Sequence, residues 1–277
     1  MENKTTIAFI GGGNMTQSLV SGLLESGFSK NQIWVSDRNE AKLKRLSSQF
    51  GVQTHSSNTA VAELAHILVL SVKPQDMPVL MTELKEILKN RQTLVISIAA
   101  GIKSQHLEKW IGSPMPIVRA MPNTPSLLRA GATGLYANTR VSEEQRNLAE
   151  TLLRAVGITV WVNHENDMDA VTALSGSGPA YFFLMMEALQ EGAEKLGLSS
   201  QVARLLTLQT ALGAARMALE SDINLKELLA KVASPGGTTE KALNTLETGG
   251  IRDLFSRALQ SAKDRSIEIS QLFDKES

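Results

Sequence analysis

Short apolar runs rich in β-branched residues alternate with helical patterns over the first 165 residues. Strands that are apolar on both faces, each followed by a helix, are typical of a parallel sheet covered by helices on both sides. From residue 166 onward the helical patterns continue without a convincing strand. We therefore predict an α/β domain at 1–165, followed by an all-α domain at 166–277.

The predicted elements are short strands with helices between them, and then longer helices. Strands are expected at 6–10, 32–36, 67–72, 93–98, 117–121 and 156–162. The helices between them are expected at 15–24, 40–50, 77–88 and 104–111. The later helices are expected at 178–196, 199–220, 225–232, 239–248 and 251–273.

Charge and cysteine content narrow the function. The chain balances 28 Lys and Arg against 28 Asp and Glu without a basic run, which disfavours nucleic acid or an anionic membrane surface as a partner. It has no cysteine and four isolated histidines, so we expect no disulfide and no metal site. The longest apolar stretch, 180–186, is far shorter than the roughly 20 residues that span a bilayer, and we expect a cytoplasmic protein.

Three glycines end the first predicted strand. Gly11, Gly12 and Gly13 are followed at once by a helical pattern, the order strand, phosphate turn, helix of a dinucleotide-binding domain. Thr16 occupies the third glycine position of G-x-G-x-x-G, so the closest packing of helix on strand is relaxed there. A plain tight connection is the alternative. In context, the turn predicts a Rossmann-type domain that binds a nicotinamide dinucleotide.

The second predicted strand ends where a dinucleotide fold meets the adenosine ribose. Asp37 suits the two free hydroxyls of NAD, whereas Ser36, Arg38 and Asn39 suit the 2′-phosphate of NADP. Alternatively, Asp37 and Asn39 cap the next helix. We expect NADPH to be preferred and NADH to be usable.

Three more loops follow predicted strands, at 72–74, 99–101 and 121–125. Loops at the carboxyl ends of parallel strands line the ligand crevice. Their small or proline-stiffened residues let a flat nicotinamide approach the backbone closely. The alternatives are that Lys73 is a solvated charge and that the prolines only shape turns.

A second glycine loop lies near the other end of the chain, at 234–239. Gly236 and Gly237 free the backbone to turn, and Thr238 and Thr239 then open a helix whose unpaired N–H groups carry partial positive charge. The loop predicts a binding site for a small anion.

Six segments, in order, resemble the pyrroline-5-carboxylate reductase family over 7–266. They are 9–15, 72–74, 97–101, 119–125, 174–181 and, most specifically, 233–239. The resemblance implies NAD(P)H-dependent reduction of 1-pyrroline-5-carboxylate to L-proline, the last step of proline biosynthesis. It also implies a Rossmann domain followed by a helical domain that interlocks two subunits, giving a homodimer and, as a larger assembly, a decamer of five dimers.

The resemblance also implies site residues. For the cofactor they are Gly11, Gly12, Gly13, Asn14, Met15, Ser36, Asp37, Arg38, Asn58, Val72, Lys73, Pro74, Ala99, Ala100, Gly101 and Asn123. For the substrate carboxylate they are Ser234 and the N–H groups of Gly237, Thr238 and Thr239, with the catalytic Thr239 hydroxyl near the ring nitrogen. Glu165 matches a position near the active site, with a polar linker residue as the alternative.

The chemistry agrees with this set of residues. A protonated cyclic imine accepts hydride directly from C4 of a reduced nicotinamide, which requires neither nucleophile nor metal. A threonine hydroxyl can donate or accept a hydrogen bond, so it suits the nitrogen before and after transfer. Two other functions are alternatives. A 3-hydroxyacid dehydrogenase of the 6-phosphogluconate type would need a lysine that 169–181 lacks, and a redox sensor without turnover would not need Thr239.

The helix predicted at the start of the second domain bears on assembly. Residues 178–186 are apolar nearly all the way round, so this helix needs cover on every side. A partner subunit is the simplest source of that cover. A central helix within one chain is the alternative.

Overall fold

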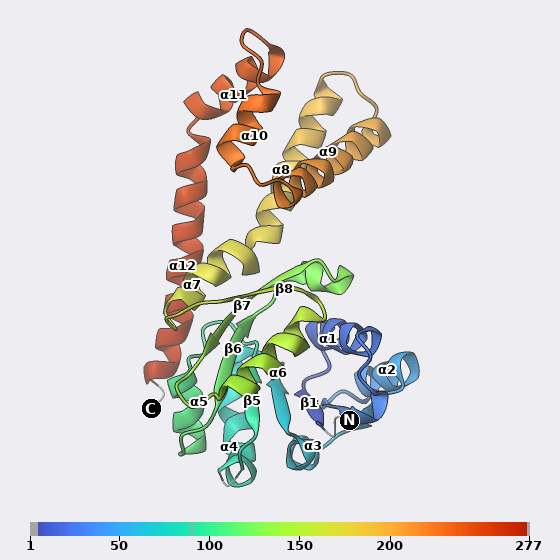
Figure 1. The fold of residues 1–277 in the computed structure, drawn as a ribbon, viewed down its shortest axis with the longest axis vertical. Coiled ribbons are helices and arrows are strands. Elements are labelled where there is room, and N and C mark those ends of the chain that lie inside the picture. Colours follow the sequence, from blue (N-terminus) through green and yellow to red (C-terminus); the bar gives the residue numbers. More distant parts are fainter. Residues whose placement is uncertain (1–4, 90, 276–277) are drawn as a thin grey trace. The chain divides into compact units, whose positions relative to one another are not determined.

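The computed structural model describes residues 5–89 and 91–275, and they form two compact units (Figure 1). The sheet unit is the chain up to Ser177 together with the part that begins at Ser261, and the helical unit is Gly178–Gln260. The last helix therefore belongs to both units. The predicted division at 165, which concerns cofactor binding and subunit pairing, stays a prediction.

The sheet unit is built on an eight-stranded sheet with the order β3-β2-β1-β4-β5-β6-β7-β8. The strands are β1 Ile7–Ile10, β2 Ile33–Ser36, β3 Gln53–His55, β4 Ile67–Leu70, β5 Leu94–Ser97, β6 Ile117–Met121, β7 Gly131–Ala137 and β8 Gly157–Trp161. Strands β1 to β6 run parallel to one another, as predicted. Strand β7, however, runs antiparallel to β6, and β8 runs parallel to β7.

An all-parallel sheet is therefore wrong for the last two strands. The connection from β6 to β7 contains only a short 3₁₀ segment, Thr124–Leu128, and Arg129 in the left-handed conformation at φ 56°. A parallel pair needs a crossover of a dozen or more residues, so this short connection forces the chain to reverse.

Helices cover the sheet on both faces and bury two apolar layers. They are α1 Asn14–Glu25, α2 Glu40–Phe50, α3 Asn58–Leu64, α4 Met77–Leu88, α5 Ser104–Ile111, α6 Glu143–Arg154 and α7 Asp167–Val171, which continues as a π-helix at Thr172–Gly176. Short 3₁₀ turns lie at Lys30–Gln32 and Pro74–Asp76. Leu19 of α1 and Leu152 of α6 pack in one layer, whereas Leu84 of α4 and Phe273 near the C-terminus pack in the other.

Several elements of the sheet unit were absent from the predicted set, namely β3, α3, β7, α6 and α7. Strand β3 is a short, polar edge strand without an apolar run. Strand β7 contains Gly131 and Gly134, which weaken a strand signal. In the folded sheet these glycines admit close neighbours, since a Cβ at Gly134 would meet the Val171 side chain.

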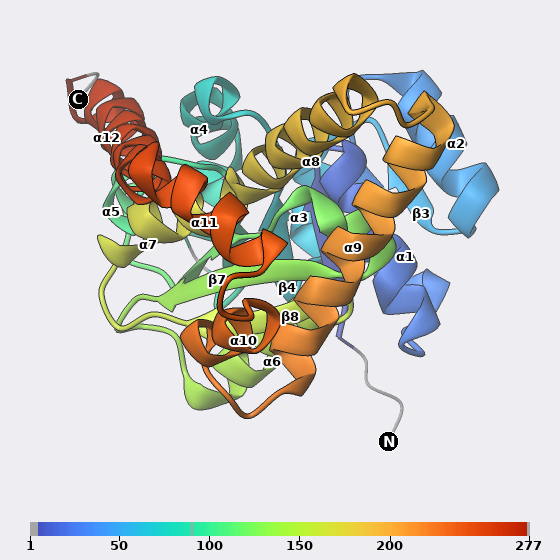
Figure 2. The ribbon, with the colours of Figure 1, turned by 90° about the horizontal axis from the view of Figure 1, so that it is seen from above.

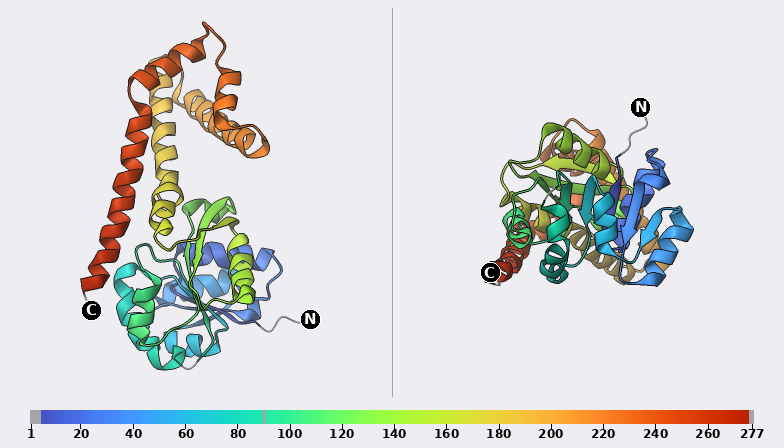
Figure 3. Two further views of the ribbon diagram at one scale, coloured as in Figure 1. Left: turned by 60° about the vertical axis from the view of Figure 1, so that its left-hand side comes forward. Right: turned by 90° about the horizontal axis from the view of Figure 1, so that it is seen from below.

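The helical unit contains α8 Gly178–Lys195, α9 Ser200–Glu220, α10 Leu225–Val232, α11 Thr238–Thr248 and the first part of α12 Ile251–Lys275. The predicted helices are thus confirmed to within a few residues at their ends. Helices α8 and α9 pack against each other (Figure 3). Gly197, at φ +100°, reverses the chain between them. No helix of the described residues is both long and apolar enough to cross a membrane.

The helical unit does not bury its apolar side chains. Ala203 is the one apolar side chain that is buried among the described residues 178–260. Phe182, Phe183 and Leu184 on α8 are 60%, 64% and 66% exposed. Apolar side chains of α9 are exposed in the same way, for example Leu205. Within the helical unit, α8 is therefore not a central helix that its neighbours bury. Its apolar surface needs to be covered by residues outside this unit.

Candidate cofactor cavity and anion loop

A cavity of about 340 Å³ lies at the carboxyl ends of β1, β2 and β4. In an open α/β sheet this edge is where ligands bind. Seven of its lining residues belong to the predicted cofactor set: Gly11, Gly13, Asp37, Arg38, Asn58, Val72 and Lys73. Five were not predicted: Ile10, Lys42, Ser71, Asp76 and Leu80. The sequence therefore located the cavity but missed part of its wall.

The glycine turn after β1 has a geometry that a side chain would destroy. Gly11 adopts φ +103°, and a Cβ there would lie 2.6 Å from the Ser71 carbonyl oxygen. Gly13 precedes α1 without a side-chain cap, and a Cβ there would meet open space. Thr16 is buried and donates from its Oγ1 to the Gly11 carbonyl at 2.5 Å, so threonine in the third glycine position stabilises the turn. The first N–H groups of α1 are left for an anion.

The Asp37 carboxylate already accepts three hydrogen bonds from neighbouring residues. Its Oδ2 accepts hydrogen bonds from the Gly12 N–H at 2.7 Å and the Lys42 Nζ at 3.2 Å, and its Oδ1 accepts one from the Asn39 N–H at 2.8 Å. Burial alone would raise the pKa of Asp37, but these hydrogen bonds outweigh burial and lower the pKa below its ordinary value. A carboxylate has about four acceptor sites, so Asp37 cannot hold both ribose hydroxyls and keep these bonds.

The cavity has a cationic rim formed by Arg38, Lys42 and Lys73. Arg38 is exposed and makes no ion pair with any residue that the structure describes. Asn39 caps α2 by accepting from the N–H groups of Ala41 and Lys42, which bears out the helix-cap alternative for this residue. This cap places Lys42 at the third helical position, and the cap signal after Asp37 could have identified it.

Ser36 requires a correction. Its side chain is fully buried, and its Oγ donates to the Asn58 Oδ1 at 2.9 Å. The Ser36 hydroxyl therefore does not face the cavity as a 2′-phosphate ligand would. It orients Asn58 instead, whose Nδ2 donates to Glu83 at 3.1 Å. Ser36 is therefore linked to the cavity only through Asn58, which lines it.

These features fit a dinucleotide. The glycine turn leaves space that side chains would fill, the start of α1 offers N–H groups, and the rim offers cations for phosphate. In addition, the Ser71 Oγ is buried on the cavity wall without a hydrogen-bond partner among the described residues. A ligand hydroxyl or phosphate oxygen would satisfy it.

The other predicted nicotinamide loops lie outside this cavity. Gly101 has φ +75°, and a Cβ there would lie 2.6 Å from the Ile269 side chain, so the end of α12 packs directly over the loop at 99–101. Asn123 uses its side chain for structure: its Nδ2 donates to the Ser175 carbonyl at 3.0 Å, and its Oδ1 accepts from the Ala132 N–H at 2.9 Å. Any nicotinamide contact at Asn123 would have to use its backbone.

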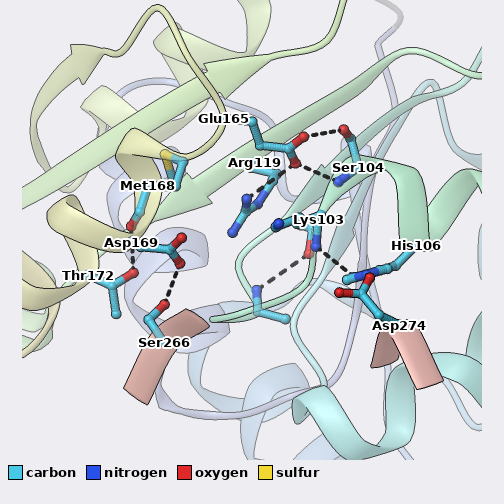
Figure 4. Close-up of polar contacts among 12 residues, drawn as sticks. Lys103, Ser104, His106, Arg119, Glu165, Met168, Asp169, Thr172, Ser266 and Asp274 are labelled. Atoms are coloured by element: carbon cyan, nitrogen blue, oxygen red, sulfur yellow. Dashed lines mark hydrogen bonds and ion pairs between the residues drawn. The ribbon is translucent and has the colours of Figure 1, made fainter. Parts of the chain in front are cut away.

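The Glu165 carboxylate lies beside Ser104, the first residue of α5, and beside Arg119 (Figure 4). This carboxylate accepts from the Ser104 N–H at 2.6 Å, the Ser104 Oγ at 2.9 Å and the Arg119 Nη1 at 3.2 Å. Arg119 is 5% exposed, so this ion pair neutralises a buried cation. Burial raises the pKa of the nearby Tyr136, and the Glu165 charge adds to the rise. Glu165 thus has a structural task, and its contact with substrate stays a prediction.

The end of α12 is anchored to the sheet unit by polar contacts that the sequence did not reveal. The Ser266 Oγ donates to the Asp169 Oδ1 at 2.7 Å, and both residues are buried. The His106 Nε2 and the Asp274 Oδ1 are 2.8 Å apart, while the His106 Nδ1 accepts from the Lys103 N–H (Figure 4). These contacts hold α12 over the loop at 99–101.

The anion loop, residues 234–239, connects α10 to α11 (Figure 2). Gly236 has φ +73°, and its N–H donates to the Glu240 Oε2 at 2.7 Å. Gly237 precedes α11 at φ −80° without a side-chain cap, and its N–H donates to the Ser234 carbonyl at 3.0 Å. The left-handed glycine is therefore Gly236 alone. The uncapped start of α11 leaves the N–H groups of its first turn for a ligand.

Comparisons with known proteins agree with this geometry. A family model described as pyrroline-5-carboxylate reductase dimerisation matches residues 165–269, and one described as NADP oxidoreductase, coenzyme F420-dependent, matches residues 6–101. A pyrroline-5-carboxylate reductase of Pseudomonas aeruginosa is 49% identical over 265 residues, which cover 96% of this chain and 97% of that protein.

Solved structures are similar over the whole chain. A pyrroline-5-carboxylate reductase from Coxiella burnetii is 51% identical with a TM-score of 0.93, covering 97% of this chain and 99% of that one. A pyrroline carboxylate reductase from Plasmodium falciparum with NADP bound is 30% identical with a TM-score of 0.86, covering 98% of this chain and 99% of that one.

Proposed function

Because this chain belongs to the pyrroline-5-carboxylate reductase family, we propose that it reduces 1-pyrroline-5-carboxylate to L-proline, the last step of proline biosynthesis, with NADPH as the preferred donor. A reduced nicotinamide supplies the hydride. The chain itself supplies the groups that hold the two reactants and a hydrogen-bond partner for the ring nitrogen.

The anion loop carries this proposal. Ser234 and the N–H groups of Gly237, Thr238 and Thr239 hold the substrate carboxylate at the uncapped start of α11, with the Gly237 N–H shared between the carboxylate and the Ser234 carbonyl. The Thr239 hydroxyl contacts the ring nitrogen, and it is available for this because the structure gives it no hydrogen bond to a described residue. On the sheet unit, the residues predicted for the cofactor, with Ser36 acting only through Asn58, hold the dinucleotide along the cavity and the loops at 99–101 and 123.

A steady-state assay tests the proposed activity. The purified protein should oxidise NADPH only when 1-pyrroline-5-carboxylate is added, and proline should form in equal amount. If the protein instead oxidised a 3-hydroxy acid with NADP⁺ or NAD⁺, the result would support a hydroxyacid dehydrogenase. Dinucleotide binding without turnover of the imine would support a sensor.

Cofactor preference should depend on Arg38, a cavity-lining cation that directly follows Asp37 and has no ion-pair partner among the described residues. We expect a higher kcat/KM with NADPH than with NADH. Arg38→Ala should remove most of this preference, because a charge-assisted pair with phosphate contributes about 1–3 kcal/mol. Both values should be measured at one salt concentration. Equal efficiency of the two cofactors in the unmutated protein would rule out this role of Arg38.

The substrate carboxylate site predicts a selective defect for Gly237→Val. A Cβ at Gly237 would lie 3.0 Å from the Ser234 carbonyl oxygen, and a branched side chain would block approach to the helix start. We expect KM for the imine to rise by about tenfold, with kcat and the KM for NADPH little changed. Gly236→Ala is the contrasting variant, since its strained φ of +73° should lower the melting temperature. A Gly237→Val enzyme with an unchanged KM for the imine would exclude the anion loop as the binding site of the substrate carboxylate.

The chain forms a homo-oligomer through the dimerisation segment matched at 165–269. We propose a homodimer as its basic unit, a decamer of five dimers as the larger assembly, and the cytoplasm as its location. The exposed apolar surface of α8 and α9 supports subunit pairing, since a surface of that kind is covered in a stable protein.

A further inference from the structure

Two acidic side chains line the cofactor cavity, and one of them, Asp37, directly follows β2, beside the proposed site of the 2′-phosphate, with a lysine against it. Asp37 and Lys42 both line the cavity, and the Lys42 Nζ is 3.2 Å from the Asp37 Oδ2. The Asp37 side chain is only 12% exposed, whereas that of Lys42 is 48% exposed. The acid is therefore fixed within the wall, and the lysine reaches it from the more open side.

Asp37 stabilises the fold around the cavity, which explains why an acidic residue is present there. Its carboxylate fastens the glycine turn through the Gly12 N–H at 2.7 Å and the start of the next helix through the Asn39 N–H at 2.8 Å. A carboxylate makes such bonds more strongly than a neutral acceptor. Its negative charge, however, repels the phosphate of NADP, and like charges a few ångströms apart disfavour binding.

We propose that Lys42 is a specificity-determining positioning residue that admits the 2′-phosphate by neutralising Asp37. The inference rests on the proposed use of NADPH and extends it. Arg38 then attracts the phosphate directly, while Lys42 removes the repulsion by pairing with Asp37. NADH lacks this phosphate, so its use does not depend on the pair.

A double-mutant cycle tests the inference. Values of kcat/KM for NADPH and NADH are measured for the unmutated enzyme, Lys42→Met, Asp37→Asn and the double variant. Lys42→Met should lower the NADPH value about tenfold, the size expected for one partly screened charge, and change the NADH value less than about twofold. In the Asp37→Asn background, Lys42→Met should change the NADPH value less than about twofold.

Lys44→Met is the matched control, because it removes the same charge from the same helix but lines no part of this cavity. Lys44→Met should leave kcat/KM unchanged for both NADPH and NADH. A tenfold NADPH loss from Lys42→Met in both backgrounds would mean that Lys42 contacts the phosphate itself, and it would overturn the inference. An equal loss with both cofactors would also overturn it, since Lys42 would then only support the fold.

Nucleotide binding separates this inference from the proposed reaction. Dissociation constants for NADP⁺ and NAD⁺ are measured with the same four proteins by titration of the oligomeric enzyme. The inference expects the NADP⁺ constant alone to rise about tenfold in Lys42→Met, even if the imine were not a substrate. An unchanged NADP⁺ constant in that variant would refute the inference and leave the proposed reaction untouched.

Discussion

Thr239→Ala should lower kcat for imine reduction by roughly 10- to 100-fold, as expected when one hydrogen bond of about 1.5–3 kcal/mol is lost in the transition state. The hydroxyl is expected at the ring nitrogen, where positive charge disappears as hydride arrives. Its removal should therefore affect the chemical step. The KM for the imine should change little, because the carboxylate is held by N–H groups and Ser234, and NADPH affinity should stay the same.

The competing explanation is that Thr239 only stabilises the start of α11. The structure argues against it, because the residue before α11 is Gly237 and no side chain caps the helix. Thr239→Ser should restore most of kcat, since it keeps the hydroxyl. Thr238→Ala is the matched control on the adjacent position and should retain kcat. A Thr239→Ala enzyme with normal kcat would exclude the hydroxyl as the partner of the nitrogen.

Local sequence signals predicted the glycine turn and the anion loop because each feature is encoded in a few adjacent residues. Gly11 needs a left-handed conformation beside the next strand, and Gly236 needs one before α11. The cavity followed from the order of strands and helices alone. Asp37 lines the cavity, and its bond to Gly12, 25 residues away, could not be read from adjacent residues.

Contacts between distant residues could not be predicted in this way. Asp169 and Ser266 are 97 positions apart, and His106 and Asp274 are 168 positions apart. No periodicity in the sequence indicates that a helix from the far end of the chain returns to cover the loop at 99–101. The antiparallel direction of β7 was not predicted for a related reason. The length of the connection before a strand, and not the sequence of the strand itself, decides whether the strand runs parallel or antiparallel to its neighbour.

The second large effect is expected from Phe183→Glu, and it follows from the lack of an apolar core in the helical unit. Phe183 is 64% exposed in one chain, on a helix whose neighbouring Phe182 and Leu184 are equally exposed. If a partner subunit covers this surface, the substitution buries an unpaired charge, which costs about 3–5 kcal/mol. The protein should become monomeric and inactive, or insoluble, at micromolar concentration, whereas the unmutated protein should be a dimer or a multiple of it.

Val79→Glu separates this effect from the general cost of a charged residue on a helix. Val79 is 63% exposed on α4 of the sheet unit, so it matches Phe183 in exposure and is also a helical residue. Because the interface is expected on the helical unit, Val79→Glu should leave assembly and activity intact. Light scattering at several concentrations measures both variants, with the assay run on the same samples. An active Phe183→Glu monomer would show that α8 does not pair the subunits, and the cover for its apolar surface would have to come from the same chain.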